Sequence, residues 1–122
     1  MKLKDNKFRD AVLYWFPTIL TFYGVIVHFF GILKYTQVWT DHNVHIAMFV
    51  VDSLVVTGLL RKTKWGYWLA VILYVQQVIM QSYWTINYAY SSVGLGLFQF
   101  FVPAICLASL LVLMLRKNLF IS

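Results

Sequence analysis

The sequence predicts an all-α integral membrane protein, a four-helix up-down-up-down bundle that forms one domain over residues 1–122. Of the 122 residues, 61% are hydrophobic and 11% are charged, whereas a soluble domain has about 25% charged residues. The apolar residues form four runs, each close to the roughly 20 residues that a bilayer core requires. The charged residues lie in short clusters between the runs. The predicted spans are residues 11–33, 44–60, 65–88 and 94–115.

The first two spans contain the most unusual membrane residues. Residues 11–33 follow a basic segment, as the apolar part of a signal peptide does. The run is longer than the roughly 7–15 apolar residues of a signal peptide, however, and no small-residue cleavage site follows it. We therefore expect a retained membrane helix, in which His28 is the one ionisable group. Residues 44–60 lie at the short end of the range that crosses a bilayer. They contain Asp52, which is the one carboxylate in any of the four runs.

The last two spans differ in polarity. Residues 65–88 are rich in aromatic residues and glutamine, whereas residues 94–115 are mostly apolar and contain Cys106, the single cysteine. One cysteine excludes an intrachain disulfide. Each span must be helical, because lipid offers no hydrogen-bond partner to an unpaired backbone. The short connections between the spans predict antiparallel neighbours.

The basic residues predict that both termini are cytoplasmic. With four spans, the N-terminal segment, the second connection and the C-terminal tail lie on the same side of the membrane. Lysine and arginine accumulate on the cytoplasmic side, and the expected location is the bacterial cytoplasmic (inner) membrane. Clusters separated by apolar runs argue against a nucleic acid as partner and favour membrane lipids. Nine of the ten basic residues belong to these segments, Lys34 being the tenth: Lys2, Lys4, Lys7, Arg9, Arg61, Lys62, Lys64, Arg116 and Lys117.

Asp52 indicates that the bundle has a polar interior. A carboxylate at the centre of a membrane helix costs roughly 2.5–3.5 kcal/mol on insertion scales, so such residues usually face a partner, a cavity or a pathway. Two interpretations remain open. Asp52 is either protonated and hydrogen-bonded to Gln77 or Gln81, so that it holds two helices in register, or it belongs to a binding pocket.

Helical spacing places the polar residues of each span on one face. His45 and Asp52 share a face of the second span, and the third span has a polar-aromatic stripe from Tyr74 to Tyr88. On the first span, small and polar residues recur at the same spacing: Pro17, Thr21, Gly24, His28 and Gly31. At about 1.5 Å per residue, the strongly polar side chains lie in the outer half or near the midplane. The sequence thus predicts an outward-opening pocket made of His28, His45, Asp52, Tyr74, Gln77, Gln81, Trp84 and Gln99.

The composition of this pocket favours binding over catalysis. Aromatic walls suit an apolar body, and amides with a carboxylate suit a polar head. The predicted function is therefore binding of a lipid-like or small amphiphilic ligand, or a role as an accessory subunit of a membrane complex or a homo-oligomer. The sequence shows no nucleophile triad, phosphate-binding loop or HExxH motif, so enzymatic activity is not predicted.

Two alternative functions use the same residues. Asp52 could be the titrating group of a proton-coupled transporter. Histidines could instead bind a metal ion or haem in a redox protein, with His28, His42 and His45 as candidate ligands. In size and outline the chain resembles small four-span bacterial families, DoxX-like proteins among them. That resemblance rests on architecture, which by itself implies no function.

Overall fold

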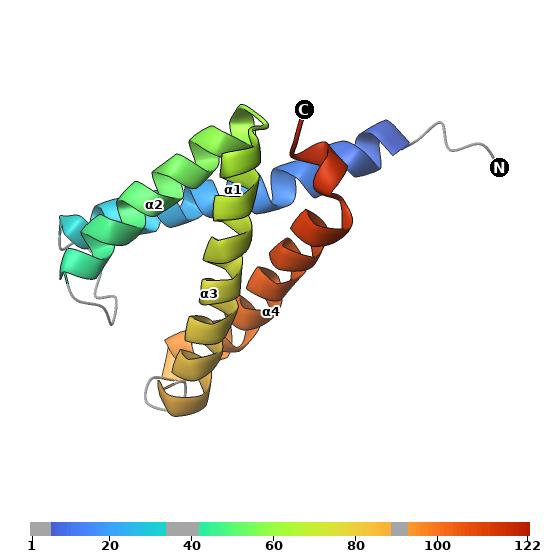
Figure 1. The fold of residues 1–122 in the computed structure, drawn as a ribbon. Coiled ribbons are helices and arrows are strands. Elements are labelled where there is room, and N and C mark those ends of the chain that lie inside the picture. The colour runs from blue at the N-terminus through green and yellow to red at the C-terminus, as the bar shows by residue number, and fades with distance from the viewer. Residues whose placement is uncertain (1–5, 34–41, 89–92) are drawn as a thin grey trace.

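A computed structural model describes residues 6–33, 42–88 and 93–122, except for the side chains of residues 42, 88 and 93–99. The described chain is all-α and forms an up-down bundle, as predicted (Figure 1). Each predicted span falls almost entirely within one helix. The elements are α1 (Asn6–Ile32), α2 (His42–Leu60), α3 (Lys64–Tyr88), α4 (Val93–Leu115) and the short 3-10 helix η2 (Lys117–Leu119).

Helix length and composition indicate an integral membrane protein. The helices α1, α2 and α3 are long and apolar enough to cross a bilayer. Helix α4 has 23 residues, and Phe100–Leu115, where its side chains are described, is a shorter apolar helix. Many large apolar residues are more than half exposed, among them Ile19, Phe22, Ile72, Ile79 and Phe101. Soluble monomers rarely present such a large continuous apolar surface to water.

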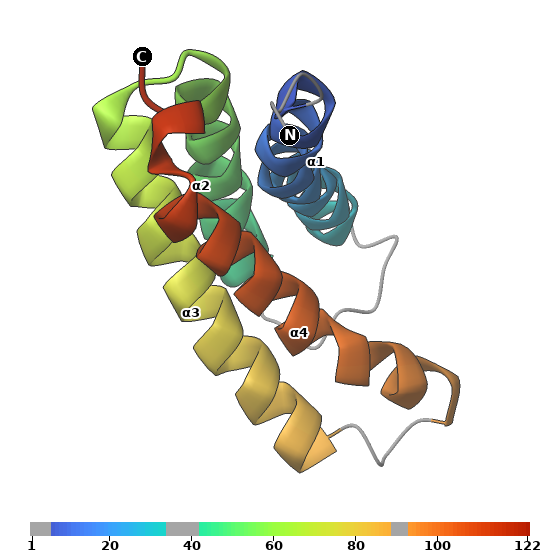
Figure 2. The ribbon, with the colours of Figure 1, turned by 90° about the vertical axis from the view of Figure 1, so that its right-hand side faces the viewer.

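The four helices form two helical hairpins that diverge from a shared end. Helix α1 packs mainly on α2, and α3 packs mainly on α4. The hairpins meet along α2 and α3 near the turn between them, and their other ends point in different directions (Figures 1 and 2). The bundle therefore has one closed end, and the hairpins separate away from it.

Two glycines bring α2 and α3 together at the closed end. A Cβ atom on Gly58 or on Gly66 would overlap the backbone of the other residue, so the backbones approach as closely as glycine permits. The turn between them has Lys62 in the left-handed region, with φ 52°. The Thr63 hydroxyl then accepts a hydrogen bond of 3.1 Å from the Gly66 N–H, which caps the start of α3.

The C-terminal tail ties α1 and α4 to the same end. Phe120 is completely buried and packs on the Tyr14 ring, with 5.5 Å between ring centroids. The Ser122 N–H donates to the Lys62 carbonyl oxygen at 3.1 Å. Arg116 Nη2 lies 2.7 Å from Asp10 Oδ1. The described basic residues of the three predicted cytoplasmic segments therefore share one end of the bundle, while the side of the membrane to which this end belongs stays a prediction.

Candidate functional site

Two glycines of α1 make room for the polar residues of α2. A Cβ atom on Gly24 would lie 2.7 Å from Asp52 Oδ2, and a Cβ atom on Gly31 would lie 2.6 Å from His45 Nδ1. Both glycines belong to the face of the first span that the spacing predicted, and that face is the one turned toward α2. The two contacts are about two helical turns apart on each helix. Because the helices are antiparallel, Gly24 faces Asp52 and Gly31 faces His45.

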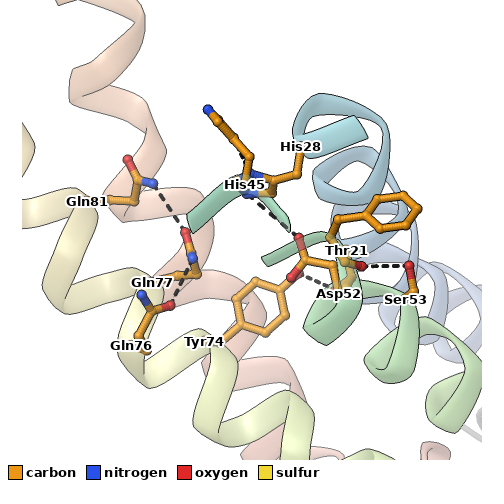
Figure 3. A network of polar contacts seen from close by, with 10 residues as sticks. Thr21, His28, His45, Asp52, Ser53, Tyr74, Gln76, Gln77 and Gln81 are labelled. Carbon is orange, nitrogen blue, oxygen red and sulfur yellow. Dashed lines mark hydrogen bonds and ion pairs between the residues drawn. The ribbon is translucent and has the colours of Figure 1, made fainter. Parts of the chain in front are cut away.

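His28 lies between these two contacts and joins them into one row. Its Nδ1 atom lies 2.9 Å from His45 Nδ1, a hydrogen bond in which one of the two rings carries the proton. Its Nε2 atom lies 3.9 Å from Asp52 Oδ2. Figure 3 shows His28 between His45 and Asp52. The row His45–His28–Asp52 therefore runs along the interface of α1 and α2.

The Asp52 carboxylate is buried but incompletely bonded. Its side chain is 6% exposed, against 18% for His28. The 3.9 Å contact with His28 exceeds hydrogen-bond distance, and the described part of the chain donates no hydrogen bond to either carboxylate oxygen. A buried polar group without a hydrogen bond costs about 1–3 kcal/mol, and more when it is charged. Asp52 therefore has acceptor capacity that the described residues leave unused.

The glutamines of α3 bond to each other instead of to Asp52. Gln81 Nε2 donates to Gln77 Oε1 at 3.2 Å, and Gln77 Nε2 donates to Gln76 Oε1 at 2.9 Å. One interpretation from the sequence was a direct hydrogen bond from Asp52 to Gln77 or Gln81. The described residues do not form this bond. The reason is the divergence of the two hairpins, which leaves space between α3 and the α1–α2 pair (Figure 3).

That space is a cavity of about 180 Å³ between the hairpins. All four helices contribute to it, and polar and apolar groups line it together. The polar side chains are Thr21, His28, Asp52, Tyr74, Gln77 and Gln81. The remaining lining residues are Leu20, Tyr23, Gly24, Val27, Leu73, Val102, Ile105 and Cys106.

Tyr74 links the two hairpins between the cavity and the closed end. Its hydroxyl lies 2.7 Å from Thr21 Oγ1 and donates to the Pro17 carbonyl oxygen at 3.1 Å. The Thr21 hydroxyl also reaches the Pro17 oxygen, at 2.7 Å. Tyr74 is 3% exposed. These bonds connect α3 to α1 across the gap and form the floor of the cavity.

The structure brings five of the eight predicted pocket residues to the cavity: His28, Asp52, Tyr74, Gln77 and Gln81. His45 is buried behind His28 and supports it without being part of the lining. Trp84 is half-buried, lies one turn beyond Gln81 and is also outside the lining. The Gln99 side chain falls outside the described residues.

The cavity also has lining residues that the predicted pocket omitted. Thr21 and Gly24 belong to the small and polar stripe of the first span, so the helical spacing contained the signal for both. Helical spacing also groups Cys106 with Gln99 and Pro103 on one face of the fourth span. The packing of α4 against α3 brings this residue to the cavity.

The described residues contain no group of three His, Cys, Asp or Glu side chains that could hold a metal ion. The His42 side chain lies outside the described part, so the proposal of histidine ligands stays a prediction. No family model matches the chain, and no curated protein or solved structure matches it either.

Proposed function

We propose that this small multi-pass membrane protein binds a small amphiphilic molecule in the cavity between its two hairpins. The observation that carries the proposal is the mixed lining. His28 of α1, Asp52 of α2 and Gln77 of α3 supply polar groups, whereas Leu20, Val102 and Ile105 supply apolar walls. Ligand sites are typically apolar clefts with a few convergent polar groups, and an amphiphile can satisfy both parts of this lining.

The size of the cavity limits the ligand. Its volume of about 180 Å³ is below the roughly 300–1,000 Å³ of pockets for drug-sized molecules. The cavity therefore encloses the polar head of the ligand and the first part of its alkyl chain. The tail extends between the diverging hairpins toward the lipid. With the basic closed end in the cytoplasm, the cavity lies in the outer half or near the midplane of the membrane.

Cys106 offers a direct test, because the single cysteine of the chain lines the cavity and is 6% exposed. Protein in phosphatidylcholine nanodiscs is treated with N-ethylmaleimide, and the rate of modification is followed by intact mass. The probes are the eight-carbon amphiphiles 1-octanol, octylamine and octyl sulfate. We expect at least one of them to slow the reaction in a saturable manner.

A matched variant controls for changes in the membrane. Cys106→Ala combined with Ala108→Cys moves the thiol to an exposed position on the same helix. A ligand in the cavity slows the reaction of Cys106 and leaves that of the control thiol unchanged. If no probe slows Cys106 more than the control, the binding proposal is wrong.

The row His45–His28–Asp52 favours proton-coupled transport as a second candidate function. Ring nitrogens 2.9 Å apart can exchange a proton between His45 and His28, and His28 is the neighbour of Asp52 in the row. This candidate predicts proton-dependent flux of a substrate in proteoliposomes that Asp52→Asn abolishes. Flux that is unchanged in Asp52→Asn would exclude it.

A further inference from the structure

Among its described lining residues, the cavity has a carboxyl group at its polar end and no permanent cation. The lining residues from the described part of the chain include Asp52 but neither lysine nor arginine. The described basic residues lie at the closed end, at the ends of helices or in the turn and tail that join them. Asp52 is separated from that end by Val55 and Leu59, which are completely buried.

His28 is the nearest basic group, but its geometry does not complete the bonding of Asp52. Its Nδ1 atom is engaged with His45, and its Nε2 atom stays 3.9 Å from Asp52 Oδ2. In a neutral pair of histidines, one proton lies between the two Nδ1 atoms and neither ring is charged. A carboxylate next to this neutral pair still lacks a counter-charge.

We infer that the polar end of the cavity selects a protonated amine as the head group of its ligand. This inference rests on the proposed function. An ammonium group carries three N–H donors and no acceptor, so it matches a carboxylate that has acceptor capacity to spare. The resulting bonds are charge-assisted and stronger than those of a neutral head.

Other head groups fit less well. A sulfate, phosphate or carboxylate head would bring a second negative charge next to Asp52, and like charges in an enclosed site disfavour binding. A hydroxyl head can donate one hydrogen bond to the carboxylate but leaves its charge without a partner. The expected order of affinity is therefore amine, then alcohol, then sulfate.

The test uses the protection of Cys106 in nanodiscs, with octylamine, 1-octanol and octyl sulfate as probes of equal chain length. Concentrations are expressed per bilayer lipid, so that different partitioning does not enter the comparison. We expect octylamine to protect at an apparent dissociation constant at least about tenfold lower than that of 1-octanol, which corresponds to about 1.4 kcal/mol. We expect octyl sulfate to protect least.

Asp52→Asn keeps the shape of the side chain and removes its charge. We expect this variant to lose the preference for octylamine while it still binds 1-octanol. If Asp52→Asn does not fold, Gly24→Ala replaces it, because the added methyl group occupies the space next to Asp52 Oδ2. That variant is expected to lose the preference as well.

His28→Gln separates the inference from its main rival, in which a protonated His28 is the internal counter-charge of Asp52. If the inference is right, wild type and His28→Gln both prefer the amine. Equal protection by octylamine and 1-octanol in the wild type would overturn the inference and leave the proposed function standing. A preference that survives in Asp52→Asn would overturn the role of Asp52, whereas no protection by any probe would refute the proposed function itself.

Discussion

Replacing Gly58 with alanine should loosen the closed end of the bundle. A Cβ atom on Gly58 would overlap the Gly66 backbone and would lie 3.1 Å from Cζ3 of the Trp65 ring. Backbone atoms cannot rotate away as a side chain can, so α2 and α3 must separate, by roughly 1 Å, to restore van der Waals contact near 3.5–4.0 Å. That separation also disturbs the neighbouring side chain of Leu59, which is completely buried.

The magnitude follows from two opposing effects. Overpacking of a well-packed interior costs roughly 1–3 kcal/mol, and a backbone contact belongs at the upper end of that range. Alanine is a better helix former than glycine by about 1 kcal/mol. We therefore expect Gly58→Ala to lower the free energy of unfolding by about 2 kcal/mol.

Reversible unfolding in mixed micelles, followed by tryptophan fluorescence and circular dichroism, measures this change. The matched control is Thr57→Ala on the adjacent exposed residue, whose hydroxyl bonds to the Ser53 carbonyl oxygen at 2.9 Å. We expect the control to stay within about 0.5 kcal/mol of the wild type. A Gly58→Ala protein as stable as the control would refute the close approach of α2 and α3.

The same unfolding assay tests three further contacts. Tyr74→Phe removes a buried hydroxyl that bonds to Thr21 and to the Pro17 oxygen, and should cost about 1–2 kcal/mol; no change would contradict the link between the hairpins. Phe120→Ala removes a completely buried ring and should cost about 3–5 kcal/mol, whereas a loss below about 1 kcal/mol would mean that the tail is not docked. Arg116→Gln breaks a partly exposed ion pair with Asp10 and should cost at most about 1 kcal/mol; a larger loss would reveal a buried role.

The helices were predictable because each follows from local composition. Lipid enforces helical structure on any sufficiently long apolar run, so hydropathy alone located all four. The spacing of Gly24 and Gly31 on the first span also indicated which face is buried. Asp52 pointed to a polar interior, because a carboxylate is too costly to face lipid.

The partners of these faces were not predictable from periodicity. A stripe on one helix gives the direction of its side chains but not the helix that it meets. Gln77 and Gln81 face the cavity as their stripe suggested, yet they bond along α3 because the hairpins diverge there. His28 meets His45 because the antiparallel register of α1 and α2 places both beside Gly31, and one sequence carries no signal for that register.

The sequence by itself thus determined the long apolar helices and the presence of an interior carboxylate, since both depend on the solvation of single segments. The tertiary structure alone decided that His45, His28 and Asp52 form a row. It also decided that Phe120 closes one end against Tyr14, and that a cavity lies between the hairpins. These features depend on crossing geometry and on contacts between residues far apart in the chain, where small backbone separations such as that of Gly58 and Gly66 set the arrangement.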